Sequence, residues 1–168
     1  MLSERQKQRV ETLVNPNLDP LGSGWNITQS KIAIGSGGFT GKGFLKGTQT
    51  GLNFVPIQST DFIFSVIGEE FGFIGSFFFI TIYIIFLYRI LFLSENQKDR
   101  FARVFGYSIF SIYLFHFSVN ISMTLGLFPV IGIPLPFVSY GGSSLLSFSL
   151  LLFVFLKLNS VKPSILAR

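Results

Sequence analysis

The side chains best suited to chemistry in this sequence are carboxylates at the start of a long apolar run. Asp61 lies in the segment QSTDFIFSVIGEEFG, and Glu69 and Glu70 follow two helical turns later. A carboxyl group desolvated beside an aromatic ring such as Phe62 has a raised pKa, which suits a general base. Asp61 or Thr60 also fits a structural role, because both residue types cap the first turn of helices. One residue can perform both roles, so both interpretations of Asp61 stay open.

Glu69 and Glu70 have two interpretations that the sequence leaves open. Carboxylates inside an apolar segment are energetically costly, which makes them candidates for function. They serve equally well in a buried network, where they pair with lysines or accept hydrogen bonds from backbone N–H groups.

A glycine-rich segment precedes the carboxylates. Residues 22–51 contain nine of the 17 glycines, and the core of this segment reads QSKIAIGSGGFTGKGFLKGTQT. Glycine permits positive φ and lets the backbone approach a ligand closely. The segment is not a nucleotide-binding loop, because a Walker A motif ending around Lys42 requires Gly at 36 and Ser or Thr at 43. The chain has Ser36 and Gly43 at those positions.

The lysines of this segment suggest a different ligand. Backbone N–H groups together with Lys31, Lys42 and Lys46 could form a cradle for a lipid-linked pyrophosphate. The alternative is a structural loop whose lysines are solvated. The residues themselves leave both interpretations open.

Polar side chains also occur in the middle of a later apolar run. His116 and Asn120 are four residues apart and therefore share one face of a helix. Polar side chains at this depth usually hydrogen-bond to neighbouring helices. We predict a packing role for this pair.

Three apolar runs must position these residues. The first, 71–93, has 23 residues with Arg89 as its one charge; the second, 104–128, has 25 residues without Asp, Glu, Lys or Arg; the third covers 143–158. At about 1.5 Å per residue, the first two cross a hydrocarbon core of ~30 Å. Prolines between the second and third runs break the helical pattern. The sequence therefore predicts an all-α polytopic membrane protein, with about three transmembrane helices and a long Gly-rich extracytoplasmic loop.

The composition agrees with a membrane protein. Apolar residues make up 49% and charged residues 12%, against about 25% charged in soluble proteins. This excludes a disordered chain and a soluble coiled coil. The chain has no cysteine and one histidine, which excludes disulfides, a thiolate nucleophile and a multi-His metal site.

The distribution of lysine and arginine predicts the orientation. Lys98, Arg100, Arg103 and Lys157 flank the apolar runs on one side, which is therefore cytoplasmic. The predicted organisation is an extracytoplasmic Gly-rich region 1–61 and a membrane region 62–168, with helices at about 66–93, 104–128 and 141–160, a cytoplasmic loop 94–103 and an outer Pro-rich loop 129–140. A polar region of about 60 residues would have to cross the membrane without a signal peptide. We therefore expect further helices upstream and a chain that corresponds to the C-terminal part of a larger protein.

Three long motifs identify a family. They are NPNLDPLGSGWNITQSKIAIGSGGFTGKGFLKGTQ, STDFIFSVIGEEFGFIG and VNISMTLGLFPVIGIPLPFVSYGGSS. In this order they strongly resemble the SEDS family, the shape, elongation, division and sporulation proteins of the bacterial cell wall. The resemblance covers roughly residues 8–160. Three triplets favour the rod-shape branch of the family over the division branch: Gln29-Ser30-Lys31, Gly41-Lys42-Gly43 and Gly47-Thr48-Gln49.

The resemblance implies a glycosyltransferase of the bacterial cytoplasmic membrane that polymerises lipid II into peptidoglycan glycan strands. Whole family members have about ten transmembrane helices, and their partners are a class B penicillin-binding protein and the cell-elongation machinery. The essential aspartate of the family's TDFIF motif maps onto Asp61. The position two residues earlier is often His in the family and is Ser59 here, so no fixed His–Asp pair is expected.

The resemblance and the residue types together give a set of expected site residues. Asp61 is expected to be catalytic and to take the proton from the acceptor 4-hydroxyl group. Lys31 and Lys42, with or without a divalent cation such as Mg or Mn, would neutralise the leaving pyrophosphate. The residues expected to bind substrate are Lys31, Ser36, Gly37, Lys42, Gln49, Thr60, Glu70, Ser139 and Tyr140.

Two other functions fit the same sequence. A flippase or transporter of lipid-linked precursors would move lipid without making polymer. An inactive fragment would retain only an interaction with a penicillin-binding protein.

Overall fold

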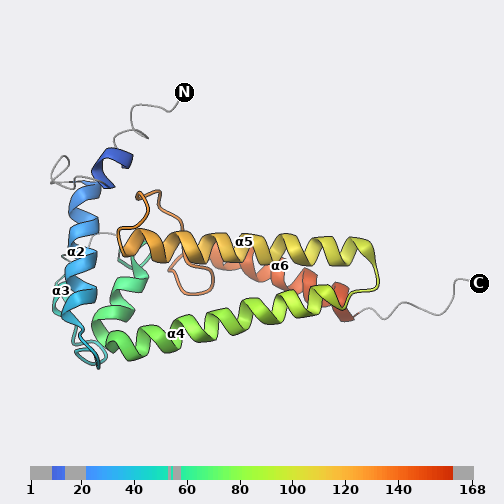
Figure 1. Cartoon of the computed structure of the whole chain (residues 1–168), viewed down its shortest axis with the longest axis horizontal. Helices are drawn as coiled ribbons and strands as arrows, with labels where there is room; N and C mark the ends of the chain where they lie inside the picture. The colour runs from blue at the N-terminus through green and yellow to red at the C-terminus, as the bar shows by residue number, and fades with distance from the viewer. Residues whose placement is uncertain (1–8, 14–21, 53, 55–57, 161–168) are drawn as a thin grey trace, which may run out of the picture.

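The computed structural model describes residues 9–13, 22–52, 54 and 58–160. Within this part of the chain every regular element is helical. The labelled helices in Figure 1 are α2 (Ser23–Ser36), α3 (Thr48–Gly51), α4 (Ile63–Glu95), α5 (Arg100–Thr124) and α6 (Gly142–Ser160). The helices α4, α5 and α6 are each long and apolar enough to cross a membrane. The prediction of an all-α chain with three such helices is confirmed.

The helices α4 and α5 form a hairpin with α6 beside it, and α2 runs across one end of this group (Figure 1). A short turn joins α4 to α5 at the opposite end. Asp99 caps the start of α5 by accepting a hydrogen bond from Ala102 N at 3.2 Å. The helices α2 and α3 and the loop 125–141 lie at the same end of the hairpin (Figure 1). Asp61 lies there too, because its carbonyl oxygen accepts a hydrogen bond from Asn120 near the end of α5, and this end is called the Asp61 end below.

The helix α5 ends at Thr124, four residues before the apolar run does. Gly126 takes a φ of 68°, which reverses the chain after the last helical turn. The N–H groups of Leu127 and Phe128 then both turn back to the carbonyl oxygen of Ser122. Because apolar residues continue past the turn, the sequence pattern alone predicts the end of α5 four residues beyond its observed end.

A break at Gly72 divides α4 into two parts. Gly72 has φ 66° and ψ −159°, which lies outside helical geometry. The glycine-rich loop supplies the backbone partners that a broken helix lacks. Lys42 N and Gly43 N donate to the carbonyl groups of Glu69 and Glu70 before the break, at 3.1 and 2.9 Å. Beyond the break, the N–H groups of residues 73 and 74 donate to the carbonyl groups of residues 38 and 39, at 2.9 and 3.1 Å.

Gly72→Ala is expected to lower the free energy of unfolding strongly. An L-residue in this backbone region is strained by about 1–3 kcal/mol. A Cβ atom would also stand 2.3 Å from Gly41 N and 2.8 Å from Phe39 O, so the loop would have to move. Unfolding in detergent by SDS titration measures the change. The control is Gly35→Ala in α2, where a Cβ meets nothing within 4 Å, and equal stability of the two variants would contradict the prediction.

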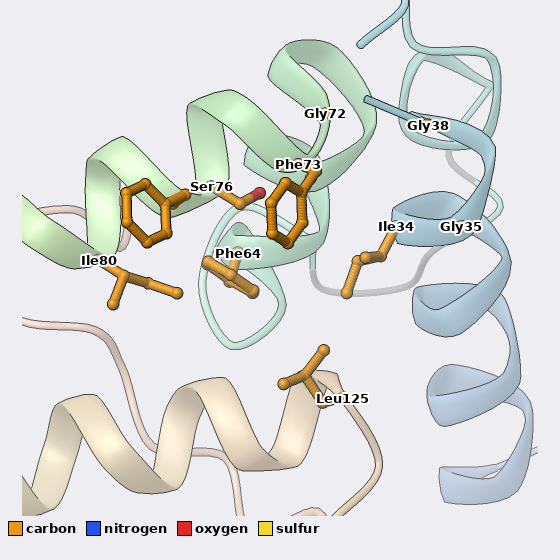
Figure 2. A pocket seen from close by; sticks show the side chains of 11 residues that line it. Ile34, Gly35, Gly38, Phe64, Gly72, Phe73, Ser76, Ile80 and Leu125 are labelled. Carbon is orange, nitrogen blue, oxygen red and sulfur yellow. The ribbon is translucent and has the colours of Figure 1, made fainter. Parts of the chain in front are cut away.

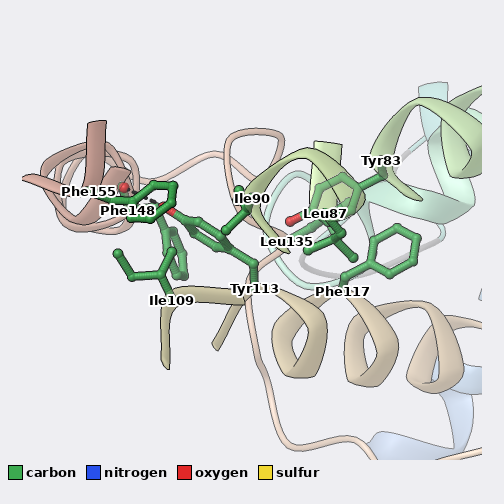
Figure 3. Packing of buried hydrophobic residues seen from close by; sticks show 9 residues of the cluster. All are labelled: Tyr83, Leu87, Ile90, Ile109, Tyr113, Phe117, Leu135, Phe148 and Phe155. Atoms are coloured by element: carbon green, nitrogen blue, oxygen red, sulfur yellow. Dashed lines mark hydrogen bonds between the residues drawn. The ribbon is translucent and has the colours of Figure 1, made fainter. Parts of the chain in front are cut away.

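The apolar core lies between the three long helices. It comprises Tyr83, Leu87, Ile90, Ile109, Tyr113, Phe117, Leu135, Phe148 and Phe155 (Figure 3). The Tyr83 ring stacks on Phe117 with centroids 4.2 Å apart. The Tyr113 hydroxyl donates to the Phe148 carbonyl oxygen at 2.7 Å and so ties α5 to α6. Leu135 comes from the loop 125–141, so the core also anchors that loop.

The helix α2 lies in the region where the sequence predicts a Gly-rich loop. It begins after Gly22 without a side-chain cap, and no acidic residue occupies its first turn, so local signals for a helix are weak. Long-range contacts hold it instead. The Ser30 hydroxyl donates to the Thr124 carbonyl oxygen at 2.8 Å, and Ala33 is fully buried with Phe62.

Candidate functional site

The backbone around Asp61 is held by the loop 125–141 and α5. The carbonyl groups of three consecutive residues, 59, 60 and 61, each accept a hydrogen bond from that side. The donors are Tyr140 N to Ser59 O at 2.8 Å, the Ser139 hydroxyl to Thr60 O, and Asn120 Nδ2 to Asp61 O at 2.9 Å. The position of Asp61 is therefore set by elements about 60 to 80 residues away in sequence.

The Asp61 side chain does not cap α4. The N-cap position belongs to Phe62, and no side-chain hydrogen bond caps this helix. Thus the predicted capping role of Asp61 or Thr60 is wrong. Ser65 closes the first turn instead, since its N–H and its hydroxyl both donate to the Phe62 carbonyl oxygen, at 3.0 and 2.7 Å.

The Asp61 carboxyl group is half-buried at a cavity of ≈ 270 Å³. The described residues that line this cavity are Arg9, Gly22, Asn26, Asp61, Val130, Ile131 and Gly132. Gly132 lies against the carboxylate, because a Cβ there would stand 3.1 Å from Asp61 Oδ2. Burial raises the pKa of Asp61 above its ordinary value of 3.8, and a hydrogen bond from the Thr60 side chain opposes the rise.

Glu69 is fully buried and organises α3. Its Oε1 accepts hydrogen bonds from the backbone N–H groups of Thr48 and Gln49, both at 2.8 Å, and its Oε2 accepts one from Thr50 N at 2.9 Å. The Lys42 ammonium group forms an ion pair with Oε1 at 2.7 Å. The carboxylate of Glu69 thus fills the place at the start of α3 where an anion would bind. Of the two interpretations of Glu69, the structure supports the buried network.

The lysines predicted to bind pyrophosphate do not line the Asp61 cavity. Lys42 is paired with Glu69 and also donates to the Thr48 hydroxyl at 2.6 Å. Lys31 packs on the turn after α5, where a Cβ on Gly126 would stand 2.3 Å from its Cε. Among the described residues that line the cavity, the cation is Arg9.

The other predicted substrate-binding residues are spread around the Asp61 end. The Ser36 hydroxyl donates within α2 to the Ala33 carbonyl oxygen, and Gly37 is buried against the backbone of Gly68. Gln49 holds Glu69 through its backbone N–H. Glu70 lines a separate cavity of ≈ 290 Å³ together with Gln58 and Ser59. Ser139 is buried and hydrogen-bonded, whereas Tyr140 is 80% exposed.

His116 and Asn120 have the packing roles that their spacing predicts. His116 Nδ1 lies 3.2 Å from the Pro134 carbonyl oxygen, and Asn120 Nδ2 donates to Ile133 O as well as to Asp61 O. Both therefore bind the loop 125–141 to α5.

Three residues that line the cavity beside Asp61 are not predicted from the sequence, namely Arg9, Asn26 and Gly132. Arg9 and Asn26 precede the glycine-rich core, and nothing local connects them with a carboxylate tens of residues later. Gly132 carried a usable signal, because a glycine between prolines at 129 and 134 favours a tight turn. Its φ of 72° agrees with such a turn.

A further cavity, of ≈ 370 Å³, lies at the break in α4. Figure 2 shows side chains from α2, from α4 and from the turn after α5 around it, among them Ile34 of α2, Phe64 of α4 and Leu125 of the turn. Among the described residues of its lining, none has a charged side chain, and the side-chain oxygen is that of Ser76. These residues offer apolar contacts and no acid–base group.

The described residues contain no group of three or more His, Asp or Glu side chains that would hold a metal ion. In the Asp61 cavity, Asp61 is the carboxylate that the structure describes. One carboxylate and an arginine do not match the oxygen-rich shell that Mg or Mn prefers, so no step is assigned to a divalent cation.

Comparison with known proteins identifies the class. Residues 1–162 match the model of the FtsW/RodA/SpoVE cell cycle protein family. The chain belongs to this family, which is the SEDS family of peptidoglycan glycosyltransferases.

Within the family, the chain is similar to the rod-shape proteins. It is 47% identical over 146 residues to the peptidoglycan glycosyltransferase MrdB of Escherichia coli K12, which covers 87% of this chain and 40% of that protein. It is 45% identical over 145 residues to the peptidoglycan glycosyltransferase RodA of Treponema pallidum, covering 86% of this chain and 34% of that protein. The chain thus spans about 40% or less of the length of these two relatives.

A solved structure has the same fold. It is described as "Structural coordination of polymerization and crosslinking by a peptidoglycan synthase complex". It matches with a TM-score of 0.72 at 32% identity, over 94% of this chain and 42% of that one. The arrangement of the helices described above is therefore that of part of a SEDS protein.

Proposed function

We propose that this chain carries the catalytic aspartate of a peptidoglycan glycosyltransferase that polymerises lipid II into glycan strands for cell elongation. The observation that carries the proposal is the half-buried carboxyl group of Asp61, which lines a cavity beside Arg9 and Asn26. Homology to MrdB and RodA supports the reaction class.

The proposed reaction is one displacement at an anomeric carbon. The donor carries an α-linked pyrophosphate and the product bond is β-1,4, so a single inversion is required. Asp61 removes the proton from the 4-hydroxyl group of the acceptor N-acetylglucosamine. The acceptor oxygen forms a bond to the donor anomeric carbon, and the bond from that carbon to the pyrophosphate oxygen breaks. The leaving group is undecaprenyl pyrophosphate.

The developing charge on the leaving group needs a cation close to Asp61. Arg9 lines the same cavity and is better placed for this task than Lys42, whose ammonium group is paired with Glu69. Lys31 remains a candidate because its side chain is exposed, but it packs on the turn after α5 and does not line the cavity. Arg9 is therefore the first candidate to neutralise the leaving group, followed by Lys31 and then Lys42.

The proposed orientation places Asp61 outside the cytoplasm. The turn between α4 and α5 carries Lys98 and is followed by Arg100 and Arg103, whereas the loop 125–141 has no charged residue. By the positive-inside rule, the turn is cytoplasmic and the Asp61 end faces the opposite side of the bacterial cytoplasmic membrane. A class B penicillin-binding protein is the proposed partner, since the solved structural relative is described as a synthase complex that couples polymerization to crosslinking.

Incubation with lipid II tests the function. Two proteins are compared in lipid nanodiscs: the 168-residue chain, and E. coli MrdB in which this chain replaces the matching segment. The expected result is a ladder of glycan products on a gel from the chimera. Movement of labelled lipid II across vesicles without any polymer would instead support the flippase alternative and overturn the proposal.

A further inference from the structure

Asn120 is an unusual residue for the middle of an apolar helix. It is fully buried in α5, and its Nδ2 group donates two hydrogen bonds, to Asp61 O at 2.9 Å and to Ile133 O at 2.8 Å. Its Oδ1 atom is buried and has no hydrogen-bond partner among the described residues. A buried amide with an unpaired oxygen loses free energy relative to a well-packed apolar side chain. Stability alone therefore does not account for asparagine at this position.

The two hydrogen bonds of Asn120 join two segments of the Asp61 end. One bond reaches the main chain at Asp61, and the other reaches the loop 125–141 close to Gly132. Gly132 is the residue whose missing side chain leaves room for the Asp61 carboxylate. A single amide group thus fixes both the residue that carries the carboxylate and the backbone against which that carboxylate lies.

Ser139 binds the carbonyl group of the residue before Asp61. Its hydroxyl donates to Thr60 O and accepts a hydrogen bond from Leu135 N at 2.8 Å. Leu135 is buried in the core between α4, α5 and α6. The carbonyl groups of residues 60 and 61 are therefore linked, through the side chains of Ser139 and Asn120, to the loop 125–141 and the buried core of the helix bundle.

We propose that Asn120 is a positioning residue that, together with Ser139, holds Asp61 at its cavity by binding consecutive main-chain carbonyl groups. The inference rests on the proposed catalytic role of Asp61. Neither residue needs to touch the substrate in this role. Each acts by keeping the carboxylate at the edge of the cavity and out of bulk water. Loss of either bond lets the segment 59–61 move toward solvent.

The protonation of Asp61 reports on this position without any need for catalysis. Burial raises the pKa of the Asp61 carboxyl group, so release of the segment lowers that pKa toward the ordinary value. Among the described residues, the charged group that shares the cavity is Arg9. In the loop 125–141 the titratable side chain is Tyr140, which is 80% exposed and does not line the cavity. On α5, His116 is turned toward Pro134. A change in the midpoint of the Asp61 titration can thus be distinguished from the titration of other side chains.

The test uses carbodiimide, which modifies protonated carboxyl groups, on the chain in nanodiscs. Mass spectrometry of the peptide that contains Asp61 gives the extent of modification at each pH. Asn120→Ala and Ser139→Ala are each expected to lower the midpoint toward the ordinary range of aspartate, because the carboxyl group loses part of its burial. Tyr113→Phe is the matched control, because it also removes a buried donor from α5, but one that binds Phe148 O in α6. Its midpoint is expected to equal that of the unaltered chain.

In the chimera with MrdB, Asn120→Ala is also expected to lower kcat about 10- to 100-fold while KM stays within about twofold, because misplacement affects the reaction step. Midpoints that are the same in Asn120→Ala, Ser139→Ala and Tyr113→Phe would overturn the proposal. A fall in kcat and midpoint for the first two alone would support it. If the unaltered chimera makes no polymer, the proposed function fails, and the carbodiimide midpoints still decide whether Asn120 positions Asp61.

Discussion

Replacing Asp61 by asparagine is expected to reduce glycan polymerisation by about 10²- to 10⁴-fold, the range of a lost general base. The amide keeps the size of the side chain and its place beside Gly132, so the fold and the cavity are retained. It cannot accept the proton of the acceptor hydroxyl group. The measurement is the initial rate of lipid II consumption by the chimera with MrdB.

The matched control for Asp61→Asn is Asp99→Asn at the opposite end of the hairpin. Asp99 caps α5 through Ala102 N, and asparagine caps helices as well as aspartate does. Its rate is expected to equal that of the unaltered chimera. Equal rates for the Asp61 and Asp99 variants would remove Asp61 from the reaction.

The pH dependence of the same rate follows from the burial of Asp61. The base must be ionised, and burial raises its pKa above 3.8, so the acid limb of the rate profile lies above the ordinary range of aspartate. The rate rises with pH through this limb. The free energy of unfolding changes in the opposite direction with pH. Because burial raises the Asp61 pKa, the folded protein binds the Asp61 proton more tightly than the unfolded chain does. The stabilisation from that proton is present at low pH and is lost as the pH rises through the folded-state pKa.

Glu69→Gln is expected to lower the free energy of unfolding by about 3 kcal/mol, a value typical of breaking a buried ion pair on one side. Three backbone N–H groups of α3 lose a charged acceptor, and the Lys42 ammonium group loses its partner. The measurement is SDS titration in detergent, followed by the fluorescence of Trp25 on α2.

Glu70→Gln is the control for the Glu69 prediction, because it makes the same change at the neighbouring buried position. The structure shows no bond from the Glu70 side chain to the described residues of α3; that side chain lines the cavity beside Ser59. Its effect on unfolding is expected to be below about 1 kcal/mol. If the two variants unfold alike, the Glu69 network does not stabilise the Asp61 end.

Much of this architecture follows from local sequence. The three long helices follow from uninterrupted apolar runs, whose length fits a membrane whatever their neighbours are. Asp61 stands out because a carboxylate at the edge of such a run is rare and belongs to a specific motif. Asn120 also stands out, because an amide inside an apolar helix needs a hydrogen-bond partner.

The parts that sequence reasoning missed depend on distant contacts. The helix α2 has weak end signals and is held by Thr124 and Phe62, which are far along the chain. In the sequence, Gly72 is indistinguishable from any other glycine in a helix. The break there depends on hydrogen bonds with the backbone of residues 38–43, which the sequence does not show. The pairing of Lys42 with Glu69 joins residues 27 positions apart, so no local pattern in the sequence indicates this ion pair.

The break at Gly72 has a consequence for how the chain is made. A nascent segment enters the bilayer by its length of continuous apolar helix, and only the part of α4 after the break, residues 73–95, has to do so. Glu69 and Glu70 precede the break, so the two carboxylates lie outside the continuous apolar helix. The glycine-rich loop supplies backbone partners for both residues, and a membrane helix can therefore begin next to buried acidic residues.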